Sequence, residues 1–285
     1  MKEEFVRTAM LLGEEAIEKL QKARVAVFGV GGVGGYAVEA LARCGVGALD
    51  LIDSDTVSRS NINRQILATH STVGMLKVDA AKDRVLDINP ECVVTTYPIF
   101  YLPETAEQFD FTQYDYIVDC IDTVTGKLQL VERAVAAGTP IICSMGTGNK
   151  LDPSAFQVAD IAKTSMCPLA RIMRKELKKR GIDHIKVVYS QEEALTPTVD
   201  EEELKRTGKR QIPGSVAFVP GAAGNVATED VIHMCDEMGV VTGIDLDKAI
   251  ATSRRLVEIL GHNTDSYLLR AGKSKDLIQE LPVKR

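Results

Sequence analysis

The sequence has few residues arranged in the way that transition metals require. Its 285 residues include 6 cysteines, but these are scattered, and no two form a C-x-x-C pair. The 4 histidines are isolated as well, and none stands at helical spacing from another possible ligand. Because zinc and dithiol sites take closely spaced ligands, we expect no zinc and no dithiol chemistry.

Long apolar runs are also absent. No stretch approaches the length that spans a bilayer, and the start, MKEEFVRTAM, lacks the apolar core of a secretory signal. We therefore expect no membrane association and a cytoplasmic location. Lys and Arg total 34 against 40 Asp and Glu, and the net charge of -6 argues against a protein coated in basic groups for nucleic acid.

The first half of the sequence alternates helical patterns with short apolar runs. This alternation is typical of β-α-β units, so we predict an α/β fold with a Rossmann-like, mostly parallel sheet. The expected helices cover residues 13–22, 33–44 and 77–88. The expected strands cover residues 24–30, 48–53, 93–97, 116–120 and 140–144.

The second half is less regular from residue 146 onward. It contains a basic helix over 168–180 and a polar segment over 191–211 that we expect to be a mobile loop, because long polar loops in compact domains usually work as lids or binding elements. A further strand over 215–220 is expected to lead into a helix from residue 224. These additional strands would extend the sheet.

The first chemical signal is a glycine-rich turn between a buried strand and a helix, with Asp53 at the end of the next strand. Such glycines let the backbone approach a polyphosphate, and a strand-end carboxylate can accept from ribose hydroxyls. Taken alone, the turn leaves a nicotinamide or flavin dinucleotide and ATP equally open. Its glycines are Gly29, Gly31, Gly32 and Gly34.

The second signal, D-S-D-T-V-S-R-S-N-I-N-R-Q from Asp53 to Gln65, decides between these nucleotides. A dehydrogenase leaves Arg64 and the later Lys77 unexplained, whereas nucleotidyl transfer needs cations around the α-phosphate and pyrophosphate. The third signal is D-C-I-D, ending at Asp122, with Lys127 five residues beyond. A carboxylate there can hold Mg²⁺ on a triphosphate, and the lysine can contact the leaving pyrophosphate.

These ordered motifs resemble those of the ubiquitin-activating-enzyme-like, or ThiF-type, superfamily of adenylating enzymes. The resemblance implies an adenylation fold, with ATP and Mg²⁺ as cofactors and Asp122 as the Mg²⁺ ligand. It also implies a homodimer in which Arg7 reaches into the neighbouring subunit's phosphate site. The implied nucleotide ligands are Gly29, Gly31, Gly32, Gly34, Asp53, Asp55, Asn61, Arg64, Gln65, Lys77, Asp122 and Lys127, and the implied catalytic residues are Arg7, Arg64, Lys77 and Asp122.

The second half resembles the tRNA threonylcarbamoyladenosine dehydratases within that superfamily, through Lys163-Thr164, Pro168-Leu169-Ala170 and the basic helix. The implied arrangement is a single domain over 1–285, with a nucleotide-binding half (1–150) and a tRNA-binding half (151–285). The basic helix carries six cations against Glu176, a charge of +5, which suits an RNA backbone but also an ordinary solvated face. The expected tRNA contacts are Arg171, Arg174, Lys175, Lys178 and Lys179.

The reaction that this resemblance implies is an ATP-dependent cyclising dehydration of N6-threonylcarbamoyladenosine at position 37 of tRNA, through adenylation of its carboxylate. An alternative is adenylation of the C-terminus of a ubiquitin-like sulfur-carrier protein, although such activators usually carry the paired cysteines that this chain lacks. A non-catalytic nucleotide-binding scaffold is a further reading. Cys167 is expected to be structural, since the tethered ureido group makes a cysteine nucleophile unnecessary.

Overall fold

The computed structural model describes residues 2–195 and six positions near the C-terminus: 247, 248, 250, 251, 254 and 255. The chain groups into two compact units, Met1–Phe218 and Val219–Arg285. In the second unit the described positions are helical, and Ile250 is buried. The expected strand over 215–220, the helix from 224 and residues 196–211 of the expected loop lie outside the described residues. The single-domain arrangement remains a prediction.

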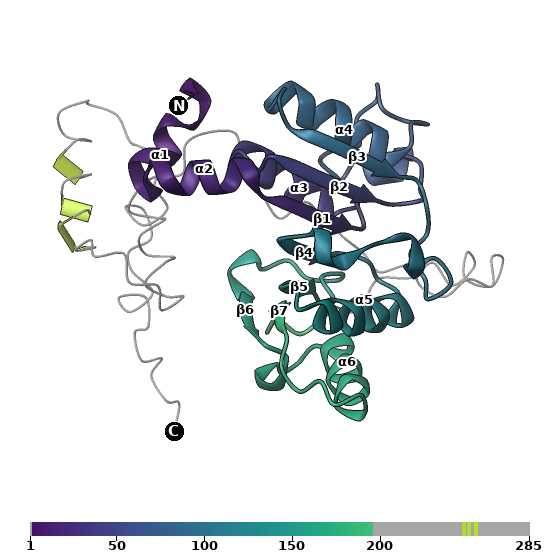
Figure 1. Ribbon diagram of the computed structural model, residues 1–285. Coiled ribbons are helices and arrows are strands. Elements are labelled where there is room, and N and C mark those ends of the chain that lie inside the picture. The colour runs from purple at the N-terminus through teal and green to yellow at the C-terminus, as the bar shows by residue number, and fades with distance from the viewer. Residues whose placement is uncertain (1, 196–246, 249, 252–253, 256–285) are drawn as a thin grey trace. The chain divides into compact units, whose positions relative to one another are not determined.

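The first unit is built on a seven-stranded sheet in the order β3-β2-β1-β4-β5-β7-β6. In Figure 1 the strands follow one another from β3 near the top to β7 and β6 below. All neighbouring strands are parallel except β6, which runs antiparallel to β7, so the predicted mostly parallel sheet with added strands is confirmed. The strands are β1 Arg24–Phe28, β2 Ala48–Ile52, β3 Val93–Tyr97, β4 Tyr116–Asp119, β5 Ile141–Ser144, β6 Phe156–Asp160 and β7 Lys186–Ser190.

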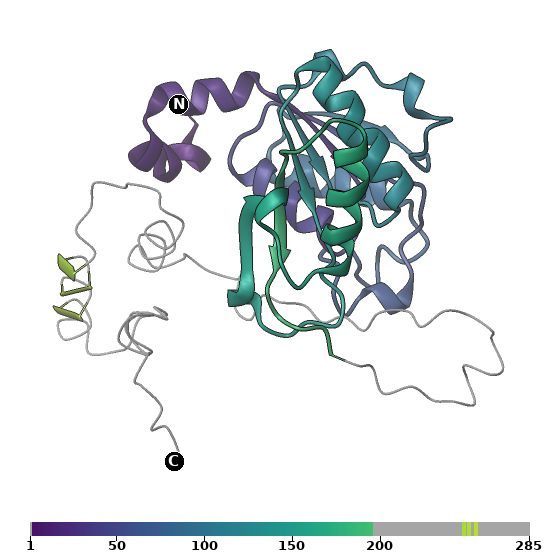
Figure 2. The same ribbon diagram turned by 90° about the horizontal axis from the view of Figure 1, so that it is seen from below.

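Six α-helices of this unit connect or flank the strands. They are α1 Val6–Leu12, α2 Glu14–Lys22, α3 Gly34–Arg43, α4 Lys77–Ile88, α5 Val124–Ala137 and α6 Pro168–Lys179. Short 3-10 turns also occur, among them η2 Arg59–Asn61 and η6 Ile161–Lys163. None of the helices described is both long and apolar enough to cross a membrane. In the view from below, β6, β7 and α6, in green, lie nearest the viewer (Figure 2).

Alternating side chains of the strands form two cores, because successive residues of a strand point to opposite faces of the sheet. On β1, Val25 and Val27 belong to the core that also takes Val38 of α3 and Val85 of α4. Ala26 and Phe28 belong to the other core, which includes side chains of α5 and α6. Buried apolar strands covered on both faces are what a parallel sheet requires.

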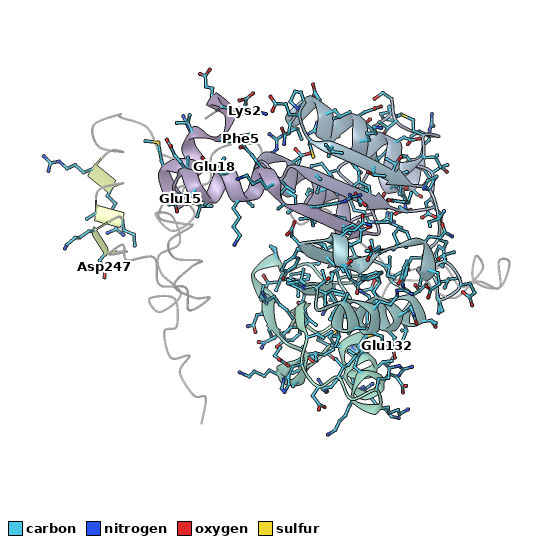
Figure 3. All side chains as sticks on the ribbon, in the orientation of Figure 1. Lys2, Phe5, Glu15, Glu18, Glu132 and Asp247 are labelled. Carbon is cyan, nitrogen blue, oxygen red and sulfur yellow. The ribbon has the colours of Figure 1, made fainter. Side chains whose placement is uncertain are left out.

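The N-terminal segment is anchored at the start of α1 by Phe5, which is 3% exposed and is labelled in Figure 3. A Cβ added to Gly45, after α3, would lie 3.1 Å from this ring, so Phe5 packs directly on the turn into β2. Further along α1 the apolar side chains are exposed instead: Met10 is 83% and Leu11 is 64% exposed. Gly13, with φ +86°, then separates α1 from α2, so the second helix begins one residue later than predicted.

Candidate active site

The glycine-rich turn joins β1 to α3 and packs against the residue that follows β4. Gly29 has φ +87°, and a Cβ there would lie 2.8 Å from the carbonyl group of Cys120. A Cβ on Gly34 would lie 1.7 Å from the Gly29 carbonyl oxygen. Neither position can accept a side chain. The prediction that this turn stands between strand and helix is confirmed, and its backbone N–H groups and the α3 N-terminus are suited to an anion.

Arg64 and Gln65 lie over this turn, as the order of the motifs suggested. A Cβ on Gly31 would be 3.7 Å from Nε2 of Gln65, and one on Gly32 would be 3.9 Å from Cγ of Arg64. Gln65 is buried and Arg64 is half-buried. The Arg64 guanidinium donates from Nη1 to the Ser60 carbonyl oxygen at 2.7 Å. The Arg64 side chain thus starts beside the glycine-rich turn, and Ser60 holds its guanidinium.

Asn61 shapes the segment that presents these two residues. Its side-chain Oδ1 accepts from the Ser58 N–H at 3.0 Å, within a reciprocal capping box at η2. Its main-chain oxygen accepts from the N–H groups of Arg64, at 3.1 Å, and Gln65, at 2.9 Å. Because Asn61 is 9% exposed and its side-chain oxygen has a partner, its observed contacts are structural.

Two carboxylates and one ammonium group meet at the end of β2. Asp53 accepts the Val30 N–H at 2.8 Å, which ties it to the glycine-rich turn, and the Asp55 N–H at 2.9 Å. The Nζ of Lys77, at the start of α4, lies 2.7 Å from Asp55 and 3.9 Å from Asp53. Lys77 is only 6% exposed. Its Coulomb interactions are therefore less screened than those of a surface lysine.

Asp122 is exposed in the connection from β4 to α5, and β1 alone separates β4 from β2 in the sheet. Its carboxylate is therefore accessible to a ligand at the carboxyl end of the sheet. The crevice outside the carboxyl ends of the strands is where open α/β sheets bind ligands.

The placement of Lys127 differs from the prediction. Its ammonium is fully buried and donates to Asp119 Oδ2 at 2.9 Å and to the Ser144 carbonyl oxygen at 2.7 Å. A lysine held in this way is not a surface cation for pyrophosphate, so we withdraw it from the nucleotide ligands. Asp119 had no role in the sequence interpretation, although a carboxylate closing an apolar strand is a signal that a buried partner is needed.

Cys120 and Cys143 lack the environment of an activated nucleophile. Burial, together with the Asp119 charge, raises the pKa of Cys120 to about 12. Burial likewise raises the pKa of Cys143 well above its usual value. Cys167 is 4% exposed and caps α6, its Sγ accepting the Ala170 N–H at 3.5 Å. Buried thiols that stay protonated are inert, and the structural role expected of Cys167 remains a prediction.

The cations of the basic helix, α6, fall into two groups, those that bond within the chain and those exposed on one side of the helix. Arg174 donates to the Thr164 carbonyl oxygen at 2.9 Å and to its Oγ1 at 2.7 Å, which holds the turn before α6. Lys179 pairs with Glu176 at 2.6 Å. The remaining three expected tRNA contacts are exposed and stand at positions i, i+4 and i+7, on one side of the helix: Arg171, Lys175 and Lys178.

Arg7 lies on α1 and is exposed. It is carried by the same short helix as the exposed side chains of Met10 and Leu11. The structure describes one chain, and the action of Arg7 on a partner subunit remains a prediction.

Known proteins resemble this chain over most of its length. A model of the ThiF family matches residues 5–266. The tRNA threonylcarbamoyladenosine dehydratase of Bacillus subtilis (strain 168) is 43% identical over 239 residues, 81% of this chain and 94% of the relative. The dehydratase of Escherichia coli (strain K12) is 39% identical over 210 residues, 70% of this chain and 77% of the relative.

A solved structure is similar to this chain in both fold and sequence. The crystal structure of the E. coli tRNA N6-threonylcarbamoyladenosine dehydratase, TcdA, in complex with ATP matches with a TM-score of 0.68 at 33% identity. The match covers 88% of this chain and 96% of that chain. With the family model, the relatives and the mostly parallel sheet in agreement, this chain belongs to the ThiF family.

Proposed function

We propose that this chain is an ATP-dependent tRNA threonylcarbamoyladenosine dehydratase. The observation that carries the proposal is the cluster at the carboxyl end of the sheet. There Arg64 lies beside the glycine-rich turn, Lys77 lies beside Asp53, which accepts an N–H of that turn, and Asp122 is exposed after β4. Relatives that match the chain over most of its length bear this enzyme name, and one of them has been solved with ATP.

The nucleotide would lie with its phosphates on the turn after β1. The N–H groups of Gly31 and Gly32 and the N-terminus of α3 would receive the phosphates, with Arg64 above them. Asp53 would bind the ribose, and its orientation is fixed because the Val30 and Asp55 N–H groups hold both of its oxygens. Lys77 would exchange part of its contact with Asp55 for the α-phosphate.

The residues present fit Mg²⁺ that is bound mainly through the nucleotide. Among the described residues, no group of three or more His, Cys, Asp or Glu side chains could hold a metal ion alone. Mg²⁺ at such sites typically takes one or two carboxylates together with substrate phosphates and water. Asp122 would supply the carboxylate, and bound Mg²⁺ would neutralise charge on the triphosphate.

The proposed reaction has two displacements. The threonyl carboxylate of the modified nucleoside attacks the α-phosphate, pyrophosphate leaves, and an acyl-adenylate forms. The ureido group of the same nucleoside then attacks the activated carbonyl, loses a proton and expels AMP, so that the nucleoside loses one water overall. Tethering of the second nucleophile replaces a covalent enzyme intermediate, which agrees with the protonated thiols of Cys120 and Cys143.

Two further features belong to the proposal. The chain would act as a homodimer, in which the exposed apolar side chains of α1 are covered by the partner and Arg7 completes the partner's phosphate site. Transfer RNA would lie along α6, with phosphates at its exposed stripe. The stripe is Arg171, Lys175 and Lys178.

Mass spectrometry of nucleosides from tRNA incubated with the protein and Mg-ATP tests the function. The expected result is loss of one water from threonylcarbamoyladenosine, with AMP and pyrophosphate formed in equal amounts. An adenylated sulfur-carrier protein with unchanged tRNA would instead identify an activator of that carrier. Nucleotide binding without pyrophosphate release would indicate a non-catalytic protein.

A further inference from the structure

The connection from β4 to α5, which carries Asp122, rests on a fully buried ion pair. The side chains of Asp119 and Lys127 are both 0% exposed, and the ammonium is 2.9 Å from Asp119 Oδ2. The same ammonium donates to the Ser144 carbonyl oxygen, the last residue of β5, at 2.7 Å. One cation thus joins the ends of two neighbouring strands to the first turns of α5.

Lys127 stays charged in this position. Burial by itself lowers the pKa of Lys127, but the opposing charge and hydrogen bond of Asp119 outweigh it, and the pKa of Lys127 lies above its ordinary value. A neutral Asp119 would leave the ammonium without a counter-charge at a site that water does not reach. The structure therefore holds the Lys127 ammonium directly against Asp119.

The pair also fixes the backbone that leads to Asp122. The second oxygen of Asp119, Oδ1, accepts the N–H of Ile121 at 3.2 Å, which folds the chain back just before Asp122. On the other side, the Cys120 N–H donates to the Phe28 carbonyl oxygen at 2.7 Å, and Gly29 allows the close approach of the Cys120 carbonyl. Residues 119–121 are therefore held between the buried ion pair and the glycine-rich turn.

Stability alone is a poor reason for such a pair. Removing two charges from water costs several kcal/mol for each ion, and well-packed apolar side chains are often as stabilising. The surrounding core already consists of apolar side chains, such as Leu128 and Leu130 of the same helix. What the charged pair adds is direction, because it aims hydrogen bonds at one N–H group and one carbonyl oxygen.

We propose that Asp119 and Lys127 are positioning residues that orient Asp122 toward the metal-bound phosphates. Lys127 pairs with Asp119, the first carboxylate of the D-C-I-D segment, whereas Asp122, the second, stays exposed. This proposal rests on the proposed function, since it takes Asp122 as the Mg²⁺ ligand. Outer partners of metal ligands typically change metal affinity by about 10-fold to 100-fold when they are removed.

Calorimetric titration of ATP with and without Mg²⁺ tests the proposal without turnover. The variants are Asp119→Asn, the uncharged double variant Asp119→Asn/Lys127→Met, and Asp122→Asn. We expect the first two to bind Mg²⁺-free ATP as the wild type does, but to lose about tenfold or more of the affinity that Mg²⁺ adds. Asp119→Asn keeps a hydrogen-bond acceptor but leaves the buried Lys127 ammonium without its counter-charge, so we expect it to be less stable than the double variant, which removes both charges.

The control is Arg24→Met, which breaks another ion pair to a buried carboxylate, between Arg24 at the start of β1 and Asp50 in the middle of β2. It should lower the melting temperature and leave the Mg²⁺ effect unchanged. A wild-type Mg²⁺ effect in a folded Asp119→Asn or double variant would overturn the positioning role. If Asp122→Asn also retains the full Mg²⁺ effect, the metal role in the proposed function fails as well, so the two failures are distinguishable.

Discussion

Two carboxylates, Asp50 and Asp119, are buried on the same face of the sheet, Asp50 in the middle of β2 and Asp119 at the end of β4. Asp50 is 1% exposed and receives Arg24 at 2.9 and 3.1 Å, the Tyr114 hydroxyl at 3.0 Å and the Tyr97 hydroxyl at 3.4 Å. All four of these hydrogen bonds come from side chains. Asp119 instead receives Lys127 and a backbone N–H.

This difference separates two uses of a buried charge. The Asp50 cluster links side chains from neighbouring strands, and the Arg24 guanidinium also lies 5.8 Å from the centre of the Tyr114 ring, so its hydrogen bonds contribute to packing. The Asp119 pair acts on the main chain beside an exposed carboxylate, Asp122. We therefore expect changes at Asp50 to alter stability, and changes near Asp119 to alter chemistry.

The largest effect is expected at Asp122. Asp122→Asn removes the negative charge while keeping the size of the side chain, and we expect the rate of pyrophosphate formation to fall about 100-fold or more. The melting temperature should stay near that of the wild type, because the side chain is exposed. Pyrophosphate release and calorimetry of the same preparation measure both quantities. Near-native turnover would remove Asp122 from the mechanism.

At Asp50 we expect the reverse: a loss of stability with an unchanged rate. Arg24→Met leaves a buried carboxylate with only tyrosine hydroxyl donors, and we expect a loss of about 3 kcal/mol in the free energy of unfolding. Chemical denaturation measures this loss, and the rate of AMP formation per folded molecule should not change. A lower rate of AMP formation in fully folded protein would show that the Asp50 cluster and the Asp119 pair are coupled.

A third test extends the comparison to α6. There Arg174 bonds the turn before the helix, whereas the side chains of the stripe are exposed. Changing Arg171, Lys175 and Lys178 to Gln should weaken tRNA binding and lower the slope of log affinity against log salt by about three. Arg174→Gln is the matched control, and it should lower stability more than tRNA affinity. Unchanged tRNA affinity and slope in the triple variant would exclude the stripe.

The smallest effect is a recovery of activity between subunits. Arg7→Ala and Arg64→Ala should each be inactive alone, but a mixed dimer would hold one complete site. Random exchange of equal amounts makes half of the dimers mixed, so about a quarter of the wild-type activity should return. Turnover of the mixture measures it. No recovery, or a monomer by light scattering, would contradict the action of Arg7 across an interface.

The elements of the first half could be predicted because their signals are local. The glycines at 29 and 34 stand where a buried strand meets a helix, and the structure shows that no Cβ fits at either position. Lys127 was misplaced because sequence distance from Asp122 does not tell which way a helical side chain points. Its position on α5 turns it toward Asp119 and the core, which only the packing of the helix on the sheet determines.

Packing also decides two features that local sequence patterns do not give, the roles of the α6 cations and the partners of β7. A count of charges gave +5 for the basic helix, but it could not separate Arg174, which caps a turn, from the stripe that faces solvent. Likewise, the pairing of β7 with β5 and β6 was not predicted. Pairing between distant strands depends on the fold as a whole, and local sequence patterns do not encode it.

The order of the strands also bears on how the chain is made. β7 lies between β5 and β6, although β6 precedes it in the sequence. During synthesis from the N-terminus, β6 emerges from the ribosome before β7, its partner among the described strands. Until Ser190 has followed, the strand edges of β5 and β6 that pair with β7 stay open. Chaperones that shield such edges would therefore act on the interval between the synthesis of residues 160 and 190.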